Sequence, residues 1–342
     1  MKRLPVEDLE HIYQNTQDIW ESFRGKSIFL TGGTGFFGKW LLESFLYVNE
    51  KFALNATITT LTRNPEIFLM EYPFYKNHSN TIKFVKGDIL NYDFKLDEKF
   101  QFIIHAATSS DEKINLSNPI ILADSIIKGT KNILNFATKN PINSFLNISS
   151  GAIYGNQPAE VSKIKESDCF SIDLYNPKAS YYESKRASEM YTSLYYEQYN
   201  LPVKTARCFA FVGPYLPLIK HFAIGNFISD VLNEKNIIVR SNGGSIRSYM
   251  YMSDLVIWLL TILIKGDNNT PYNVGSDRPV KIKELAKMIS DNTNSKVIIE
   301  DVNKQFAENI YIPSIENSVS LGLSVKISLK ESIDKTIKFY KN

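Results

Sequence analysis

The chain has 342 residues, 44% of them hydrophobic, which is enough to bury the core of one large domain or of two smaller ones. Lysine and arginine exceed aspartate and glutamate by only 39 − 36 = 3 residues. So small a surplus argues against nucleic acid as a partner and favours a small molecule.

Cysteine content and apolar runs bear on the compartment. The two cysteines, Cys169 and Cys208, lie far apart and in no metal-ligand spacing, so we predict neither a disulfide nor a metal site. The first residues, MKRLPVEDLEHIYQ, lack the apolar stretch of a secretory signal, and the longest apolar run is half of a membrane span. We therefore predict a cytoplasmic protein without a membrane segment.

The predicted elements alternate along the chain after an initial helical segment at residues 1–24. Short β-rich runs are followed by longer helical patterns up to about Phe209. The predicted strands are SIFLTG, ATITTLT, TIKFVKGD, FQFIIHAA, SFLNISS and VKTARCF, and the predicted helices include GKWLLESFLYVNE, SIIKGTKNILNFATK and SYYESKRASEMYTSLYYEQY. Repetition of strand and helix predicts a doubly wound α/β fold with a parallel sheet.

A glycine-rich turn connects the first predicted strand to the first helix that follows it. In TGGTGFFG, the glycines Gly32, Gly35 and Gly38 allow a tight turn, close backbone approach to a pyrophosphate and close contact of helix and strand. The helix start offers free N–H groups and a partial positive charge. We interpret the turn as a dinucleotide site, although an ordinary glycine-rich turn has the same pattern.

Two later strand ends carry candidate cofactor residues. Arg63 stands where such a site often has an acidic residue for the adenine ribose, and an arginine can pair with a 2′-phosphate. NADP is therefore slightly favoured over NAD, although a surface arginine would look the same. Asp88 is a candidate acceptor for the adenine amino group, or an aspartate that opens a turn.

A candidate catalytic group follows downstream. Tyr181 and Lys185 lie four residues apart in a helical pattern, so their side chains share one helix face. Ser150 ends a predicted strand and is expected at the carboxyl edge of the sheet. His105 and Glu183 are weaker candidates, because the first fits a packed strand end and the second is expected to point away from Tyr181.

Taken in order, the motifs TGGTGFFG, HAAT, SSGAIYG and YYESK resemble those of the short-chain dehydrogenase/reductase superfamily. The later segments VGP, RSYMYMSDL and YNVGS are similar to those of its extended branch, the nucleotide-sugar epimerases and dehydratases. The resemblance implies a Rossmann-type domain at residues 25–208, to which 248–275 return. It also implies a smaller substrate-binding lobe formed by residues 209–247 and 276–342.

The resemblance also implies roles for individual residues. Tyr181 would transfer the proton, Lys185 would bind the nicotinamide ribose and Ser150 would orient the substrate. A phenol has a pKa of about 10 and needs to lose roughly three units to act near neutrality. The Lys185 ammonium and an oxidised nicotinamide are the expected causes.

Further site residues follow from the same comparison of motifs. The cofactor, a tightly bound NAD(P), is expected to contact Gly32, Gly35, Phe36, Phe37, Gly38, Arg63, Asp88, Ile89, Ala106, Ala107, Tyr181 and Lys185. The substrate, a nucleotide-diphosphate sugar, is expected to contact Thr108, Ser150, Phe211, Asn226 and Arg247. Relatives often pair through the YxxxK helix, so we predict a homodimer in which Tyr191, Leu194 and Tyr195 could take part.

The chain also departs from the family pattern. Ile126 replaces a common asparagine, so polar support is missing or comes from Asp124 or Ser125. Phe211 stands where many relatives have a second asparagine, close to the substrate diphosphate, so the contacts with the substrate must differ. Relatives that eliminate water carry an acidic pair directly after the catalytic hydroxyl. The residues here are Gly151 and Ala152, neither of which can move a proton.

These departures favour an epimerase that acts through a keto sugar, with hydride held transiently on the cofactor. The alternatives are an NADPH-dependent reductase of a keto sugar or other carbonyl, a 4,6-dehydratase, a decarboxylase, and a dinucleotide-binding regulator without activity. Arg63 supports the reductase, whereas the intact group of Ser150, Tyr181 and Lys185 argues against the regulator.

Overall fold

The computed structural model describes residues 2–94, 99–108, 117–218, 222–291, 293–300 and 309–341. Its centre is a seven-stranded sheet in the order β11-β6-β5-β4-β1-β2-β3, and every neighbouring pair is parallel. The strands are β1 (Ser27–Thr31), β2 (Thr57–Thr62), β3 (Ile82–Lys86), β4 (Phe102–His105), β5 (Ser144–Ser150), β6 (Val203–Cys208) and β11 (Thr270–Val274). The predicted doubly wound α/β fold is confirmed.

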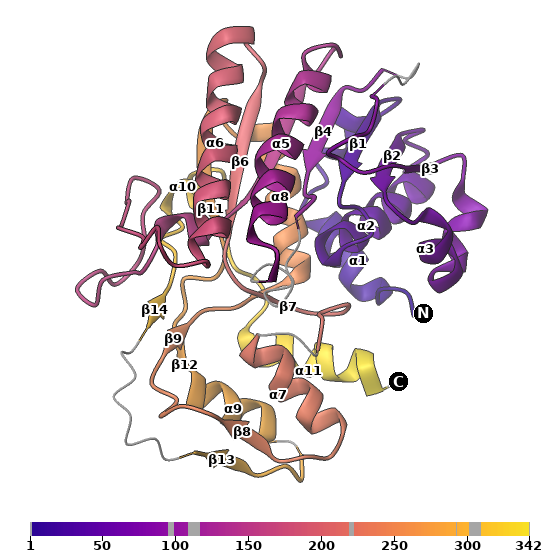
Figure 1. The fold of residues 1–342 in the computed structure, drawn as a ribbon. Helices are drawn as coiled ribbons and strands as arrows, with labels where there is room; N and C mark the ends of the chain where they lie inside the picture. Colours follow the sequence, from indigo (N-terminus) through magenta and orange to yellow (C-terminus); the bar gives the residue numbers. More distant parts are fainter. Residues whose placement is uncertain are drawn as a thin grey trace.

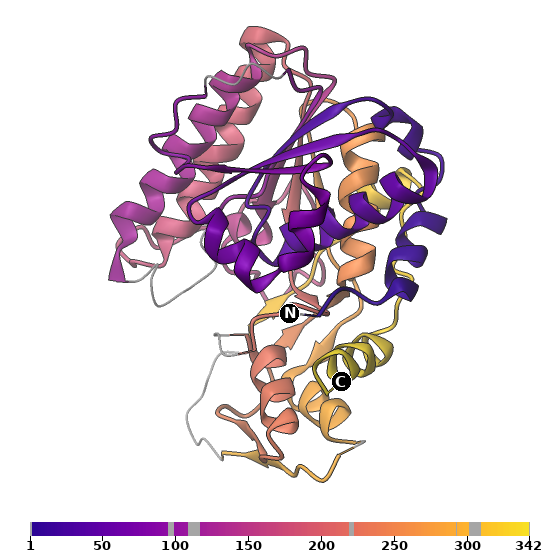
Figure 2. The ribbon, with the colours of Figure 1, turned by 90° about the vertical axis from the view of Figure 1, so that its right-hand side faces the viewer.

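Helices cover both faces of this sheet, as Figure 2 shows with the sheet seen nearly edge-on. Side chains alternate along each strand, so Ile28 and Leu30 pack into the core on one face while Phe29 packs into the core on the other. The first face carries α1 (Val6–Gln14), α2 (Phe36–Phe52) and α8 (Met252–Lys265), and the second carries α5 (Pro119–Ala137) and α6 (Ala179–Tyr199). The short elements η1 (Trp20–Phe23), α3 (Pro65–Glu71), η2 (Pro73–His78), η3 (Gly151–Tyr154) and α10 (Glu316–Ser320) lie in the connections.

The N-terminal segment is fixed to the domain by buried polar contacts. The Asp8 carboxylate, 1% exposed, accepts hydrogen bonds from the Tyr251 hydroxyl at 2.7 Å and from Lys335 Nζ at 2.8 Å. The backbone N–H of Leu4 donates to buried Glu43 at 3.0 Å. Because these carboxylates lie away from water, their partners are needed to keep the segment in place.

The second lobe lies below the sheet in Figure 1 and has a core of its own. Its helices are α7 (Ala223–Leu232), α9 (Ile282–Ser290) and α11 (Leu329–Lys341). Short strands complete it in two pairs, β10-β7 and β13-β8, and one group of three, β12-β9-β14. Their bounds are β7 (Phe211–Val212), β8 (Ile237–Val239), β9 (Ile246–Arg247), β10 (Met250–Tyr251), β12 (Val280–Lys281), β13 (Val297–Ile299) and β14 (Ile310–Tyr311). Between these segments the chain returns to the main domain, where α8 covers the sheet and β11 pairs with β6.

The strand order reverses its direction beside β1, because β2 flanks it on one side and β4 on the other. In open parallel sheets, ligands bind outside the carboxyl ends of the strands at such a point. The glycine turn follows β1, and the HAAT segment follows β4. The topology therefore brings both motifs to one edge of the sheet.

Candidate active site

The glycine turn between β1 and α2 is held by close backbone packing. Gly32 has φ +75°, and a Cβ atom there would lie 2.6 Å from the Ala106 carbonyl oxygen, after β4. A Cβ on Gly38 would overlap backbone atoms of Gly32 and Gly33. Side chains at these positions would push the turn away from the sheet edge, so the sequence argument for glycine holds at both.

The start of α2 faces the same edge. Gly35 is its N-cap and supplies no side-chain hydrogen bond, so the first N–H groups of the helix remain available for an anion. Phe36 and Phe37 open the helix, and the Phe37 ring meets Phe211 edge to face at 5.1 Å. These features fit the diphosphate of a dinucleotide.

Sequence reasoning missed Gly33. A Cβ at this position would overlap the Thr60 side chain of β2, so the glycine permits the turn to rest on the neighbouring strand. The only sequence signal was its place in an already glycine-rich turn.

The candidates for the adenosine end follow β2 and β3. Arg63 is exposed directly after β2. One carboxylate oxygen of Asp88 accepts the backbone N–H of Leu90 at 2.9 Å, which agrees with the turn-opening alternative. Ile89 is 9% exposed and packs in the core on the α5 face, and its side chain would lie 3.1 Å from a Cβ on Gly129. The structure thus places these residues at the expected edge but gives the Asp88 side chain a local partner.

The segment after β4 is ordered by a threonine of β1. The Thr31 hydroxyl accepts the N–H groups of Ala106 and Ala107 at 3.1 and 3.2 Å. Thr108 then donates its hydroxyl proton to the Ala107 carbonyl and accepts a hydrogen bond from Lys185 Nζ at 2.9 Å. Thr108 and Lys185 therefore meet between β4 and α6.

Lys185 is buried, with 5% of its surface exposed. Its ammonium donates to Thr108 and, at 2.8 Å, to the carbonyl of Ile148 on β5. Burial lowers the pKa of Lys185 to about 8. A lysine held this way presents its charge at a fixed place beside the sheet edge.

Tyr181 and Ser150 come together as the sequence predicts. Ser150 Oγ accepts the Ala152 N–H at 3.1 Å, and the Ser150 hydroxyl acts on the Tyr181 phenol by lowering its pKa. Burial raises the pKa of Tyr181, and the Ser150 hydroxyl opposes this rise. The Lys185 ammonium is directed to Thr108 and Ile148, and its action on the phenol together with a bound nicotinamide stays a prediction.

A second phenol was missed by sequence reasoning. The Tyr311 hydroxyl on β14 occupies the space that a side chain at Gly151 would need, next to Ser150. The Tyr311 ring lies 4.6 Å from that of Phe209. Burial raises the pKa of Tyr311 well above its ordinary value, so this phenol stays protonated. Nothing in the local sequence around residue 311 indicated this placement.

The remaining substrate candidates lie on the second lobe. Arg247 pairs with Tyr311 in the β9–β14 register, and its Nη1 donates to the carbonyls of Ile246 and Asn309 at 2.8 and 2.6 Å. Asn226 is exposed on α7. Phe211 is 8% exposed and packs on Phe37. Arg247 thus lies beside Tyr311, whose hydroxyl is next to Gly151. All three residues, Arg247, Asn226 and Phe211, stay predictions as substrate contacts.

Ile126 is buried in α5, and polar support from Asp124 or Ser125 stays a prediction. Asp124 pairs with Lys128 at 2.8 Å. Polar links between α5, α6 and the sheet come from Thr130, whose hydroxyl lies 3.0 Å from Ser188 Oγ and 3.2 Å from His105 Nε2.

His105 and Glu183, the weaker candidates for catalysis, both contact neighbouring side chains. Burial lowers the pKa of His105 to about 3, and its Nδ1 lies 2.8 Å from Thr31 Oγ1, so it is the packed strand-end histidine that was expected. Glu183 accepts a hydrogen bond from Arg186 at 2.9 Å.

An ion pair that is largely shielded from water links α6, the helix that carries Tyr181 and Lys185, to the sheet. Arg207 on β6 binds both carboxylate oxygens of Glu189, one turn after Lys185 on α6, and each side chain of the pair is 13% exposed. Glu189 also accepts the Ser149 hydroxyl proton, and Arg207 donates to the Tyr154 hydroxyl at 2.9 Å. This network ties α6 to the two strands under the site.

Glu189→Ala should therefore lower the free energy of unfolding by about 3 kcal/mol, because it leaves the Arg207 charge buried without its carboxylate. Urea denaturation of both proteins measures this. Glu21→Ala is the matched control, since Glu21 pairs with Arg24 at the surface and its loss should change stability much less. Equal losses in the two variants would contradict a special role of the buried pair.

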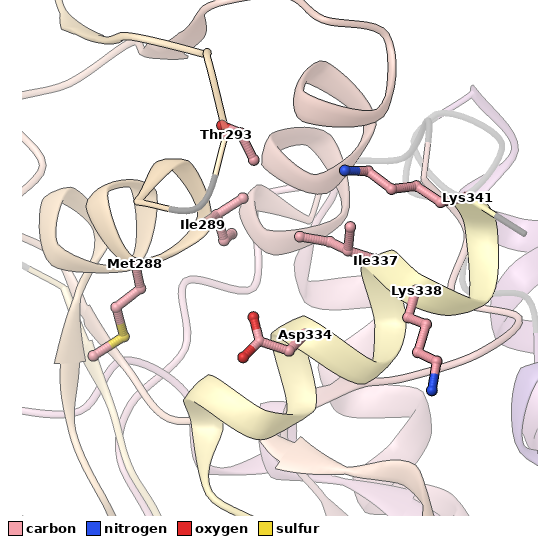
Figure 3. Close-up of a pocket in the computed structure, with 7 residues that line it drawn as sticks. All are labelled: Met288, Ile289, Thr293, Asp334, Ile337, Lys338 and Lys341. Carbon is pink, nitrogen blue, oxygen red and sulfur yellow. The ribbon is translucent and has the colours of Figure 1, made fainter.

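A hollow of about 240 Å³ lies elsewhere, between α9 and α11 (Figure 3). Its lining residues are Met288, Ile289, Thr293, Asp334, Ile337, Lys338 and Lys341. None of them belongs to the group around Ser150. Within the described ranges, no cluster of three or more His, Cys, Asp and Glu side chains could hold a metal ion, and no helix is long and apolar enough to cross a membrane.

Comparison with known proteins agrees with this geometry. Residues 28–275 match the model of the NAD dependent epimerase/dehydratase family, and the chain belongs to that family of enzymes. The human dTDP-D-glucose 4,6-dehydratase is 27% identical over 328 residues, covering 92% of this chain and 90% of that protein. A UDP-glucuronic acid decarboxylase of Xenopus tropicalis is 26% identical, covering 92% of this chain and 72% of that protein.

Solved structures share the fold. An epimerase of Methanothermobacter thermautotrophicus superposes with a TM-score of 0.80 at 22% identity, covering 96% of both chains. The UDP-glucose 4-epimerase of Thermotoga maritima gives 0.77 at 20% identity, covering 92% of this chain and 98% of that one. The extended short-chain dehydrogenase/reductase resemblance is thereby confirmed.

Lys185 leads to a prediction about cofactor binding. Its pKa of about 8 means that its charge is lost as the pH rises through that value, and a negatively charged dinucleotide then binds less tightly. We expect the dissociation constant for NAD to rise above pH 8, and to become independent of pH in Lys185→Met. Calorimetric titration on either side of pH 8 measures this.

Lys128→Met is the control, because Lys128 is an exposed lysine paired with Asp124. It should keep the pH dependence of the parent chain. An unchanged pH dependence in Lys185→Met would show that another group is responsible.

Proposed function

We propose that the chain epimerises a nucleotide-diphosphate sugar through a keto-sugar intermediate, using a tightly bound NAD(P). The observation that carries this proposal is the composition of the site around Ser150. Tyr181 and Lys185 supply one proton-transfer group and one fixed cation, while Gly151 and Ala152 supply no second acid or base. Oxidation and reduction at one carbon need nothing more.

Tyr181, Ser150 and Lys185 each have a separate role in the proposed reaction. Tyr181 accepts the proton of a sugar hydroxyl and later returns it, and Ser150 donates a hydrogen bond that favours the phenolate. Lys185 holds its ammonium beside Thr108, where it would bind the ribose of a dinucleotide. A bound dinucleotide would supply reversible hydride transfer at the same carbon. The first N–H groups of α2 would hold its diphosphate.

The competing function with specific support is 4,6-dehydration, because the human relative carries that name. Dehydration requires an acid and a base besides the tyrosine. The Tyr311 hydroxyl fills the space beside Gly151, so the position has no room for a carboxylate unless Tyr311 moves. This favours epimerisation over dehydration.

The reaction is tested by incubation with a panel of UDP-, GDP-, CDP- and dTDP-sugars, with products analysed by mass spectrometry and NMR. Unchanged mass with altered stereochemistry supports the proposal. Loss of one water would establish the dehydratase, loss of carbon dioxide the decarboxylase, and stoichiometric loss of NADPH the reductase. Release of the dinucleotide from denatured, freshly purified protein tests tight binding, and its identity tests the preference of Arg63 for NADP.

The proposed assembly is a homodimer through α5 and α6. Tyr191 and Tyr195 are engaged between these helices, since Lys131 lies over the Tyr191 ring at 4.9 Å and the Tyr195 hydroxyl bonds Asn135. Leu194 remains 49% exposed on the outer side. Light scattering of the parent chain and of Leu194→Glu tests the interface. The two unpaired cysteines fit a place in the cytoplasm. An epimerase of nucleotide sugars would serve the synthesis of polysaccharide precursors.

A further inference from the structure

Arg186 joins helix α6 to the turn η3. It stands directly after Lys185 on the helix, and its Nε donates to the carbonyl oxygen of Ile153 in η3 at 2.6 Å. Its Nη2 donates to the carbonyl oxygen of Phe170 at 2.9 Å. Its Nη1 donates to the Glu183 carboxylate, one turn earlier on α6, at 2.9 Å. One side chain therefore contacts three segments of the chain.

The turn η3 determines the surroundings of Ser150. Ser150 is the N-cap of η3, and its Oγ accepts the N–H of Ala152 within the turn at 3.1 Å. The serine hydroxyl is therefore placed by η3 as well as by β5. A shift of η3 would draw the Ala152 N–H away from the serine, and the hydroxyl would lose the bond that fixes its direction.

The turn is supported from the sheet and from the helix. On the sheet side, the Tyr154 hydroxyl donates to Asn273 Oδ1 of β11 at 2.7 Å and accepts a hydrogen bond from Arg207 of β6 at 2.9 Å. On the helix side, the turn is bound by Arg186. Because the phenol of Tyr181 moves with α6, the Arg186 contact sets the position of the turn relative to that phenol.

The segment around Phe170 completes this contact. The Phe170 N–H donates to the carbonyl oxygen of Tyr154 at 3.0 Å, while the Phe170 carbonyl accepts the Arg186 proton. The Phe170 side chain packs on the buried cluster of Ile153, Tyr154 and Ile164. Only 26% of the Arg186 side chain is exposed, so water is a poor replacement for the guanidinium at these carbonyls.

We infer that Arg186 is a positioning residue, which holds η3 at a fixed place beside α6 and so keeps Ser150 aligned with Tyr181. A planar guanidinium can direct Nε–H and Nη2–H at two carbonyl oxygens at once, whereas a lysine offers a single point charge. Glu183 already balances the positive charge. The role therefore depends on the shape of the donor, and it rests on the proposed function for its kinetic test only.

The kinetic test compares Arg186→Met, Arg186→Lys and Ser150→Ala. Arg186→Met should lower kcat about 10- to 100-fold with little change in KM, because the substrate still binds but the serine is misplaced. Arg186→Lys should recover little of this loss, whereas millimolar guanidinium ion should partly restore kcat in Arg186→Met. Full recovery in Arg186→Lys, or a guanidinium ion without effect, would overturn the inference.

A double variant shows whether Arg186 acts through the serine. In the Ser150→Ala background, Arg186→Met should cause no further loss of kcat. Losses that multiply in the double variant would contradict this route. Binding of NAD, followed by calorimetry, should stay unchanged in Arg186→Met, because Lys185 and the glycine turn keep their contacts.

Hydrogen exchange tests the contact without any substrate. In the full chain, Arg186→Met should speed amide exchange about tenfold in peptides covering residues 151–155 and 168–172, the size expected for one lost hydrogen bond. Unchanged exchange in both peptides would overturn the inference. If exchange rises but no sugar is turned over, the proposed function fails and the placement of η3 by Arg186 stands.

Arg24→Met is the matched control. Arg24 also pairs with a glutamate three residues earlier, Glu21, and its Nη1 donates to the carbonyl oxygen of Ala53 at 2.8 Å. It lies before the amino end of β1, at the opposite edge of the sheet from the site. Arg24→Met should leave kcat and the exchange of both peptides unchanged. Equal effects in the two variants would show that any arginine bound to a carbonyl acts through general stability.

Discussion

Tyr181→Phe should reduce kcat by about 10²- to 10⁴-fold, because it removes the group that accepts and returns the sugar proton. The ring itself stays, so the packing of α6 against the sheet should be preserved. The measurement is kcat with the sugar that the panel identifies. Binding of the dinucleotide, followed by calorimetry, should change little, since Lys185 and the glycine turn remain in place.

Tyr182→Phe provides the control for this variant, since it makes the same chemical change at the next position of the helix. Its kcat should remain close to that of the parent chain. Full turnover in Tyr181→Phe would contradict the assignment of the proton-transfer group. A matching loss in Tyr182→Phe would mean that the helix has been disturbed.

Gly38→Ala should abolish measurable dinucleotide binding and lower the free energy of unfolding by about 1–3 kcal/mol. Alanine is normally the better residue in a helix, by up to about 1 kcal/mol. Here the added Cβ would overlap backbone atoms of Gly32 and Gly33, which cannot move without opening the turn. The steric cost therefore exceeds the gain in helix propensity. Thermal unfolding and calorimetric titration with NAD measure the two effects.

Gly129→Ala is the control for this variant, because it makes the same change inside a helix that is not part of the glycine turn. Gly129 lies within α5, and the three atoms nearest to a Cβ there all belong to the Ile89 side chain, the first at 3.1 Å. A side-chain methyl can shift by a few tenths of an ångström, so this variant should be near neutral in stability. A Gly38→Ala chain as stable as Gly129→Ala, with intact cofactor binding, would contradict the role assigned to the turn.

Much of the fold could be predicted because its information is local. Alternating apolar runs, helical periodicity and glycines between a strand and a helix each span fewer than about twenty residues, and they combine by the rules of parallel sheets. The same locality placed Ser150 at a strand end and Tyr181 with Lys185 on one helix face.

The rest of the site depends on long-range placement. Tyr311 reaches Gly151 through the pairing of β14 with β9 and the bridge to Gln157, and no local pattern encodes these contacts. The direction of the Tyr181 pKa depends on burial, which only the assembled lobes determine. The two acceptors of the Lys185 ammonium, Thr108 and Ile148, likewise come from other elements and could not be read from the spacing on the helix.

The anchoring of α1 also has a consequence for biosynthesis. Asp8 finds its two partners 243 and 327 positions later in the chain. While the ribosome is still translating, α1 can pack on α2 but the Asp8 carboxylate has no partner yet. The native contacts of α1 are thus complete only after residues 251 and 335 have been made.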